Sequence, residues 1–235
     1  MSQSAPDVIL LEAEPQPIEI QPLKTAVILV DMQNAFVHRG GYLDLVGIDL
    51  SSVQGIVDPC RRILAAARSG GMRVLYLQMA YSERPADRGP KDTPAFRKSP
   101  SLTLIQQHPE WADRLCYAGT WGAEIIEELK PAPEDIVVRK EKYDGFIGTD
   151  LEAILKEYGI RFLIFAGTAT NICVESTLRH AFFLDYFPIL VSDAVSQKGT
   201  ALLQEATLAN VQSNFGWVTT TEHLVRAVGH GRGDD

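Results

Sequence analysis

The sequence predicts an α/β protein of three layers, in which a central, mostly parallel six-stranded sheet lies between two layers of helices in a Rossmann-like arrangement. Two observations support this fold class. Strand-like and helix-like segments alternate along the 235 residues, and such alternation is typical of parallel sheets covered by helices on both faces. The strand-like segments are also continuously apolar, as expected for strands that are buried on both sides.

Six segments have the length and the apolar, β-branched composition of buried strands. The clearest are TAVILVD at 25–31 and RFLIFA at 161–166. The full set is 25–31, 72–78, 135–140, 161–166, 187–193 and 216–220. Each is separated from the next by more than about a dozen residues, which is enough chain for the crossover that parallel pairing requires.

Helical periodicity lies between these strands. Residues 52–71 end in a Gly pair that suits a helix C-cap, and Asp58-Pro59 within them suits an N-cap and a first helical position. The other predicted helices are 120–130, 151–159, 173–186, 200–215 and a terminal helix after residue 220. Residues 79–118 are rich in Pro, Arg and Asp and have weak periodicity, so we expect a lid or a binding loop there.

One domain accounts for most of the chain. Residues 24–228 contain the whole alternating pattern and form the predicted domain. Residues 1–23 are acidic and Pro-rich and lack the basic region of a signal peptide, so we expect an extended arm that packs on the domain or on a neighbouring subunit. Residues 229–235 are polar and are expected to be a flexible tail.

Composition narrows the class of function. The formal net charge of −8 argues against a nucleic-acid partner, and no apolar stretch has the length of a membrane span. The three cysteines, Cys60, Cys116 and Cys173, form no CxxC pair, which fits neither a disulfide framework nor a zinc site. We therefore expect reduced thiols in a cytoplasmic protein, one of which is free for chemistry.

Chemistry-bearing residues gather at the carboxyl ends of the predicted strands, where parallel sheets place their sites. Asp31, Gln78 and Lys140 end three strands, and the turn GTATNIC at 167–173 follows a fourth. Cys173 opens a helix, and we expect Lys140 at the mouth of the adjacent strand, where a cation lowers the pKa of a thiol. Asp31 can take the thiol proton and deliver it to a leaving amine.

Three motifs, VDMQNAF, KEKYDGF and GTATNICVEST, resemble those of the isochorismatase-like cysteine hydrolases and occur in the same order. The resemblance covers roughly residues 20–228 and extends to ureide-cleaving members such as the ureidoacrylate amidohydrolases. It implies a hydrolase of C–N bonds in linear amides or ureides, with the family's Asp-Lys-Cys triad on Asp31, Lys140 and Cys173. Lys142 is a poorer match, because the family's lysine ends the strand three residues before the Tyr that is Tyr143 here.

The resemblance also implies the form of the turn before the nucleophile. The family has a non-proline cis peptide there, which maps to Thr168–Ala169. The N–H groups of Ala169 and Cys173 would then converge as an oxyanion hole. Nicotinamidase-like relatives bind a metal through an Asp-x-His motif, which this sequence lacks, so we expect neither a metal site nor any cofactor.

The expected substrate is a small amide or ureide. Six residues near the motifs are predicted to contact it: Asn34, Phe36, Gln78, Tyr81, Tyr143 and Asn171. The ureide-cleaving relatives follow their second strand with Gln-Asn-Gly-Trp, whereas this chain has Gln-Met-Ala-Tyr at 78–81, and an acidic loop residue of theirs matches Asp87. Because Met79 replaces an amide, we expect a substrate with a less polar tail than ureidoacrylate.

Several alternatives stay open at this stage. An amidase for aliphatic or aryl amides fits the same scaffold, and a catalytically silent binding or scaffold protein is a second alternative. A Cys-His dyad using His38 or His180 is weaker, since neither is predicted near the strand ends. Vinyl-ether hydrolysis is disfavoured because it uses no nucleophilic cysteine. Apolar C-terminal helices and the region around Trp217 predict a homo-oligomer, a dimer or a tetramer.

Overall fold

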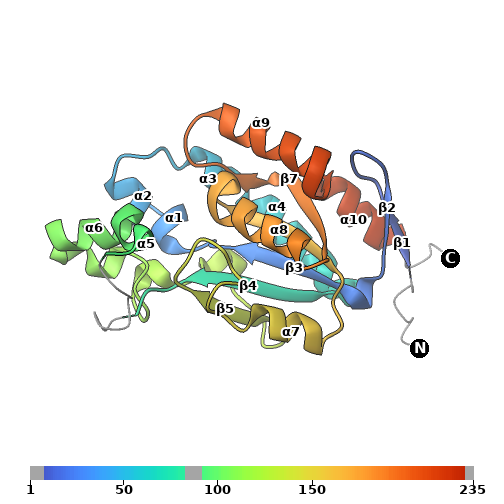
Figure 1. Ribbon diagram of the computed structural model, residues 1–235, viewed down its shortest axis with the longest axis horizontal. Helices are drawn as coiled ribbons and strands as arrows, with labels where there is room; N and C mark the ends of the chain where they lie inside the picture. The colour runs from blue at the N-terminus through green and yellow to red at the C-terminus, as the bar shows by residue number, and fades with distance from the viewer. Residues whose placement is uncertain (1–7, 83–91, 231–235) are drawn as a thin grey trace.

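The computed structural model describes residues 8–82 and 92–230 and has one central sheet (Figure 1). Six parallel strands form it, in the order β5-β4-β3-β6-β7-β8. They are β3 (Thr25–Val30), β4 (Arg73–Met79), β5 (Ile136–Lys140), β6 (Phe162–Thr168), β7 (Phe187–Ser196) and β8 (Trp217–Thr219). All six predicted strands are present, and β7 continues three residues beyond its predicted end.

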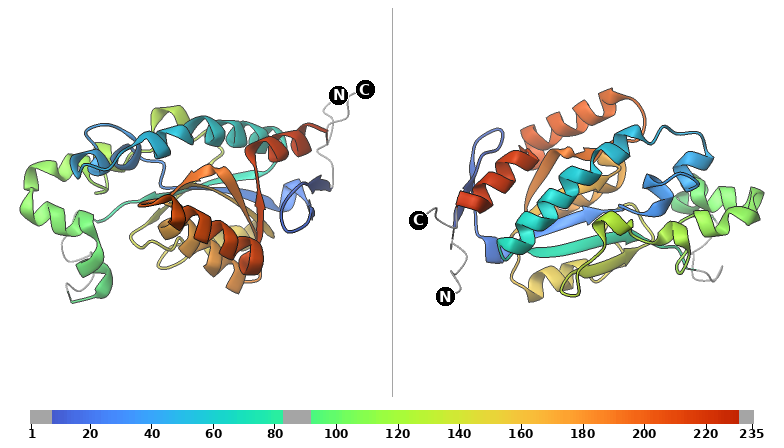
Figure 2. Two further views of the ribbon diagram at one scale, coloured as in Figure 1. Left: turned by 90° about the horizontal axis from the view of Figure 1, so that it is seen from above. Right: turned by 180° about the vertical axis from the view of Figure 1, so that it is seen from behind.

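Helices cover both faces of the sheet, which confirms the predicted three-layer α/β/α architecture. Figure 2 shows α4 (Val57–Ser69) and α10 (Thr221–His230) on one side, and α8 (Glu175–Phe183) and α9 (Ala201–Asn210) on the other. α7 (Leu151–Glu157) connects β5 to β6. No helix in the part of the chain that the structure describes is long and apolar enough to cross a membrane.

The centre of the sheet is the most deeply buried part of the fold. Every residue of β3 is buried, because β4 and β6 flank the strand and helices lie over both of its faces. Burying each Val, Ile or Leu side chain of such a strand contributes about 1.5–3 kcal/mol relative to exposure. β3 is therefore a rigid support for the residue that follows it, Asp31.

Short helices gather beyond the carboxyl ends of the strands. They are α1 (Asn34–Val37), α2 (Tyr42–Leu45), α3 (Ser51–Gly55), α5 (Pro94–Lys98) and α6 (Pro100–Gln107). Figure 1 shows α1, α2, α5 and α6 together at one end of the sheet. The segment predicted as a lid or loop over 79–118 thus contains helices where it is described, and two of them begin with proline, a residue suited to a first helical position.

The segment predicted to be an extended arm is folded back on itself as an antiparallel hairpin of β1 (Ile9–Leu11) and β2 (Ile18–Ile20). Leu11 and Ile20 are fully buried. The hairpin packs on α10 and on the end of β8, where the Thr219 hydroxyl donates to the Glu12 carbonyl over 2.7 Å. It lies at the end of the sheet opposite the short helices (Figure 1).

The helix predicted over 120–130 is wrong. Residues Trp121–Ala123 and Glu127–Leu129 form two separate turns of 3-10 helix. Tertiary contacts hold the backbone here. Gln33 bridges to Ile125 between the two turns, and a Cβ on Gly122, inside the first turn, would lie 2.4 Å from the Leu115 carbonyl oxygen. Close packing here outweighs the local helix propensity of the segment.

The remaining boundaries differ from the prediction in detail. The predicted helix at 52–71 is divided into α3 and α4, and Asp58-Pro59 lies inside the first turn of α4 instead of capping it. Gly229 and His230 of the predicted tail belong to α10, while residues 231–235 lie outside the described residues.

Candidate active site

Three strand ends bring the predicted triad together in a buried cluster. Asp31 follows β3, Lys140 ends β5, and Cys173 lies in the turn after β6. In the sheet, β4 and β3 lie between β5 and β6. The expectation that Lys140 stands on the strand adjacent to the one before Cys173 is therefore wrong. The long lysine side chain crosses the end of β4, and its Nζ donates to Oδ2 of Asp31 over 2.8 Å.

The Asp31–Lys140 pair is almost completely inaccessible, with 1% of each residue exposed. Lys140 Nζ also donates to the Lys142 carbonyl over 3.3 Å. Oδ1 of Asp31 is buried and accepts no hydrogen bond of ordinary geometry from the described residues. Because Lys140 occupies only Oδ2, Oδ1 is the oxygen free to take a proton from a thiol or from a substrate.

The backbone of Asp31 has an unusual conformation. Its φ of +52° lies in the left-handed region, which aspartate tolerates better than most residues. Its N–H donates to the Leu77 carbonyl on β4 over 2.9 Å, and its carbonyl accepts from Gln33 N–H over 2.8 Å. These two bonds turn the chain sharply after β3, so the carboxylate is held at the strand end.

The electrostatics of the thiol follow from its burial. Cys173 lies within hydrogen-bonding reach of both Asp31 and Lys140. Burial raises the pKa of the Cys173 thiol and outweighs the opposing effect of Lys140. Burial lowers the pKa of Lys140, but Asp31 and Cys173 more than compensate, so that pKa is raised. Lys140 lowers the pKa of the Cys173 thiol, as expected, but burial raises it by more. Formation of the thiolate therefore needs a base that accepts the thiol proton.

The turn that carries Cys173 is tightly packed. A Cβ on Gly167, whose φ is +110°, would lie 2.2 Å from the Val30 carbonyl oxygen, so only glycine fits where β6 passes β3. The Thr168–Ala169 peptide bond is cis. The next residues, Thr170–Val174, form a π-turn that leads into α8. Ala169 and Cys173 both lie on the wall of one cavity.

This cavity, about 90 Å³ in volume, opens at the carboxyl end of the sheet, where the short helices gather. At about 10–15 Å³ for each water molecule, it has room for one small organic molecule. Its lining is Asp31, Phe36, Tyr42, Leu43, Ile48, Asp49, Ser52, Val53, Met79, Tyr81, Ser99, Tyr143, Thr168, Ala169, Ile172, Cys173, Ser196, Gln197 and Lys198. The walls are mostly apolar, with hydroxyl groups among them, as is usual for small-molecule sites.

Three of the six predicted substrate contacts, Phe36, Tyr81 and Tyr143, line this cavity. Tyr81 Oη lies 2.9 Å from Ser99 Oγ, which joins the end of β4 to the chain before α6. Burial, followed by Cys173, raises the pKa of Tyr143. Its phenol therefore stays protonated and can donate a hydrogen bond.

The other three predicted contacts do not line this cavity, and their amides bond backbone groups, so their contact with a substrate stays a prediction. Asn34 donates to the Trp121 carbonyl, and Gln78 donates to that of Ala123. Asn171 bonds both the N–H and the carbonyl of Lys198. Asp87 lies outside the described residues. Short-range sequence order cannot distinguish an amide that faces a cavity from one that fixes a neighbouring loop.

Supporting residues were missed by the sequence analysis. The Gln33 side chain donates to the Met79 and Ala123 carbonyls and accepts from Met79 N–H, each over 2.8 Å. Near Cys173, the Thr177 hydroxyl donates to the Cys173 carbonyl over 2.7 Å and accepts from Gly145 N–H. This second network joins the turn that carries Cys173, and the helix that follows it, to the loop after Lys140.

The histidines and possible metal ligands lie elsewhere. His180 contacts Asp144, and His38 lies 3.6 Å from Glu128; neither lines the cavity. Among residues 8–82 and 92–230, no group of three or more His, Cys, Asp or Glu side chains is placed to hold a metal ion. The Cys-His alternative therefore has no support in this geometry.

Comparisons with known proteins agree with this arrangement. Residues 25–223 match the isochorismatase domain. The chain is 43% identical over 217 residues to a ureidoacrylate amidohydrolase (RutB) of Caulobacter segnis, covering 92% of this chain and 91% of the relative. It is 42% identical over 221 residues to one of Klebsiella pneumoniae, covering 94% of each.

Solved structures share the fold. A cysteine hydrolase from Pseudomonas syringae pv. phaseolicola has a TM-score of 0.73 and 30% identity, over 90% of this chain and 95% of that one. An N-carbamoylsarcosine amidase from Thermoplasma acidophilum has a TM-score of 0.64 and 26% identity, over 85% and 97%. With its fold, its motifs and its relatives in agreement, this chain is a hydrolase of the isochorismatase family.

Proposed function

We propose that this protein is a metal-independent cysteine amidohydrolase that cleaves a C–N bond of a small ureide. The observation that carries the proposal is the position of Cys173 on the cavity wall, beside the buried Asp31–Lys140 pair. Relatives named as ureidoacrylate amidohydrolases and a structural neighbour named as an N-carbamoylsarcosine amidase support a carbamoyl substrate.

The first half of the reaction forms a covalent intermediate. Cys173 Sγ attacks the carbonyl carbon of the substrate while its proton passes to Asp31. Negative charge then develops on the carbonyl oxygen, where the N–H groups of Ala169 and Cys173 stabilise it. Collapse of the tetrahedral intermediate breaks the C–N bond, and Asp31 returns its proton to the departing nitrogen.

The second half clears the enzyme. A thiocarbamate remains on Sγ after cleavage of a ureide, or a thioester after cleavage of an amide. Asp31 takes a proton from a water molecule, which attacks this intermediate and releases Cys173 as the thiol. Lys140 orients the Asp31 carboxylate in both halves and stabilises negative charge on sulfur while the bond forms and breaks.

A second candidate is an amidase for a less polar aliphatic or aryl amide. The observation that favours it is the apolar wall of the cavity, which includes Phe36, Leu43, Val53 and Met79. A buried urea N–H left without a partner costs about 1–3 kcal/mol. If Met79 leaves one such group unpaired, a ureide loses part of its advantage over an amide.

Release of ammonia tests the proposed function directly. The screen comprises ureidoacrylate, biuret, triuret, N-carbamoyl amino acids, nicotinamide, and aliphatic and aryl amides, each with and without EDTA. We expect a ureide with a carbamoyl head to be the best substrate and EDTA to change the rate by less than about twofold, because the triad supplies the nucleophile and the base without a metal.

The other outcomes are equally informative. Nicotinamide as the best substrate, or activity lost to EDTA, would contradict the proposal. Preference for a hydrophobic amide over every ureide would favour the second candidate. No turnover of any compound would favour the catalytically silent alternative.

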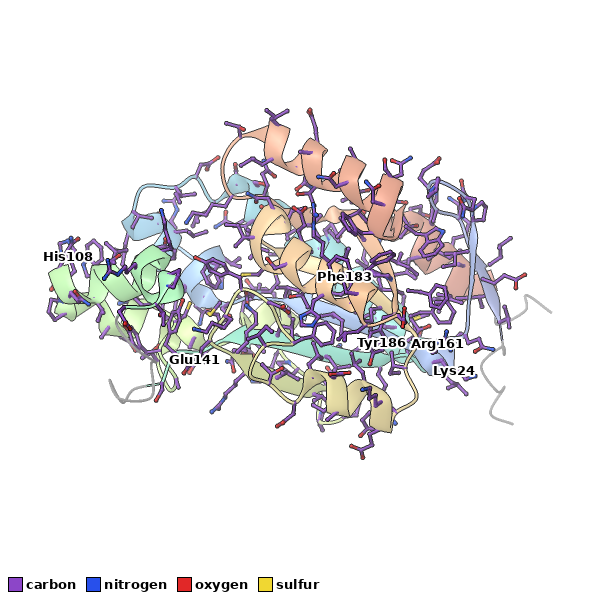
Figure 3. All side chains as sticks on the ribbon, in the orientation of Figure 1. Lys24, His108, Glu141, Arg161, Phe183 and Tyr186 are labelled. Carbon is purple, nitrogen blue, oxygen red and sulfur yellow. The ribbon has the colours of Figure 1, made fainter. Side chains whose placement is uncertain are left out.

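We also propose that the protein is a homo-oligomer. Exposed apolar side chains support this: Phe183 on α8 is 68% exposed and Leu202 on α9 is 68% exposed (Figure 3 labels Phe183). Light scattering at micromolar concentration should give the mass of a dimer or a tetramer, and Phe183→Glu should lower it because a buried charge opposes association. A monomeric wild type would contradict the proposal. Lys130→Glu, at an exposed position directly after the 3-10 turn Glu127–Leu129, serves as the control.

A cytoplasmic location and the division into a hydrolase domain over 24–228 remain proposals. A nucleophilic thiol must stay reduced, which favours a reducing compartment for Cys173.

A further inference from the structure

A lysine that forms no ion pair with the described residues lies in the wall of the cavity. Lys198 follows β7 and lines the cavity together with Cys173. Among the described residues, its ammonium group donates one hydrogen bond, to Tyr42 Oη over 3.2 Å, and forms no ion pair. Burial lowers the pKa of Lys198, and Cys173 opposes that shift. A half-buried cation of this kind is stabilised by an anion that enters the site.

The position of Lys198 is coupled to the nucleophile. The Asn171 side chain accepts from Lys198 N–H over 2.9 Å and donates to the Lys198 carbonyl over 3.1 Å. Asn171 lies two residues before Cys173 in the same π-turn. This pair of bonds fixes the backbone of Lys198 relative to the reacting sulfur, so its side chain reaches into the cavity from a defined point.

Tyr42 provides a second donor beside Lys198. Its ring lies 5.4 Å from Lys198 Nζ, and burial, followed by Cys116, raises the pKa of Tyr42 to about 12. Its hydroxyl is therefore neutral, and while its oxygen accepts from Lys198, its proton is available to an anion. A carboxylate placed between them would receive a charge-assisted hydrogen bond from each group.

The two acidic residues that line the cavity, Asp31 and Asp49, do not form an ion pair with Lys198. Asp31 is paired with Lys140. Asp49 is exposed, its two oxygens accept the N–H and the hydroxyl of Ser51, and it forms no ion pair with Lys198. Lys198 is thus the cationic side chain on this cavity wall, within the described residues, that has no carboxylate partner and can pair with a ligand.

We propose that Lys198, assisted by Tyr42, binds a carboxylate at the end of the substrate away from the scissile carbonyl. The preferred substrates are then short ureido or amido acids, with an apolar linker against Phe36 and Met79. This inference rests on the proposed function, and it makes Lys198 a specificity residue: Asp31, Lys140 and Cys173 perform the chemistry whether or not the tail is charged.

A matched pair of substrates tests the proposal. We use 3-ureidopropionate and its neutral methyl ester with the wild-type protein, Lys198→Gln, Lys198→Arg and Tyr42→Phe. Lys198→Gln should raise KM for the acid about 10- to 100-fold, the usual effect of losing a hydrogen bond to a charged group, with kcat within about threefold. KM for the ester should change less than about threefold, and Lys198→Arg should retain most of the preference for the acid.

Lys130→Gln is the matched control, because it removes one positive charge from an exposed position, where Lys130 pairs with Glu127. It should leave both substrates unaffected. An equal loss for the acid and the ester in Lys198→Gln would assign Lys198 a structural role and overturn the proposal. A wild type that uses the ester as well as the acid would also overturn it.

A second readout does not depend on turnover. Cys173 is alkylated with iodoacetate, which is anionic, and with iodoacetamide, which is neutral, at low ionic strength. The ratio of the two rates should fall roughly fivefold in Lys198→Gln, because a nearby cation attracts the anionic reagent, and should stay unchanged in Lys130→Gln. An unchanged ratio in Lys198→Gln overturns the proposal, whereas a wild type inactive on both ureides indicates failure of the proposed function instead.

Discussion

Cys173→Ala is expected to reduce kcat for ammonia release by about 10⁵-fold or more, because removing the nucleophile of a covalent mechanism leaves only binding and oxyanion stabilisation. The fold should persist: the substitution removes one sulfur atom at a cavity wall and leaves the Asp31–Lys140 pair in place. Steady-state kinetics measure the loss. Circular dichroism and the midpoint of thermal unfolding measure the fold, and we expect a change in stability of about 1 kcal/mol or less.

Cys60→Ala is the matched control for that variant. Cys60 is another free, buried cysteine, on α4, and it does not line the cavity. Its removal should affect stability but change kcat by less than about threefold, since no reacting group is lost. If Cys173→Ala kept more than about one hundredth of wild-type turnover, Cys173 would be excluded as the nucleophile.

Asp31→Asn is expected to lower kcat by about 10³- to 10⁴-fold, because an amide can neither take the thiol proton nor protonate the leaving nitrogen. Asparagine tolerates the left-handed backbone of position 31, where φ is +52°. The shape of the site should therefore be kept while its base is lost. A loss of only about tenfold would point to another base.

The same substitution should also weaken the fold. It leaves the ammonium group of Lys140 buried without its carboxylate, which typically costs about 3–5 kcal/mol. Denaturant unfolding measures this loss of stability. The value of kcat is then calculated from the concentration of folded protein. Asp31→Asn with Lys140→Met should recover part of the stability and none of the activity, whereas Asp58→Asn on the exposed start of α4 should change neither. Recovery of activity in the double variant would contradict the role given to Asp31.

The fold class was predictable because hydrophobic periodicity is a local property. Runs such as TAVILVD can be buried only as strands covered on both sides, and the helices between them force parallel pairing. The proximity of Asp31, Lys140 and Cys173 was predictable for the same reason, since each lies at or just after the end of an apolar run, and such ends meet at one edge of a parallel sheet.

The prediction failed where long-range packing competes with local preference. The segment around Gly122 has helical composition, but the backbone of Leu115 and the side chain of Gln33 leave room only for tight turns. The amides of Asn34, Gln78 and Asn171 have the chemistry of substrate ligands, yet their partners are carbonyl groups 27 or more positions away along the chain.

The sequence by itself thus determined the layered α/β architecture and placed Asp31, Lys140 and the turn before Cys173 at strand ends, because each depends on neighbours a few residues away. Their roles as base, cation and nucleophile stay a prediction. Only the tertiary structure decided that Lys140 reaches Asp31 across the end of β4, that burial raises the pKa of the Cys173 thiol, and that Lys198 lines the cavity. Those outcomes depend on the order of the strands in the sheet and on the exclusion of water from the packed site. Strand order and water exclusion arise only when segments far apart in the chain pack together.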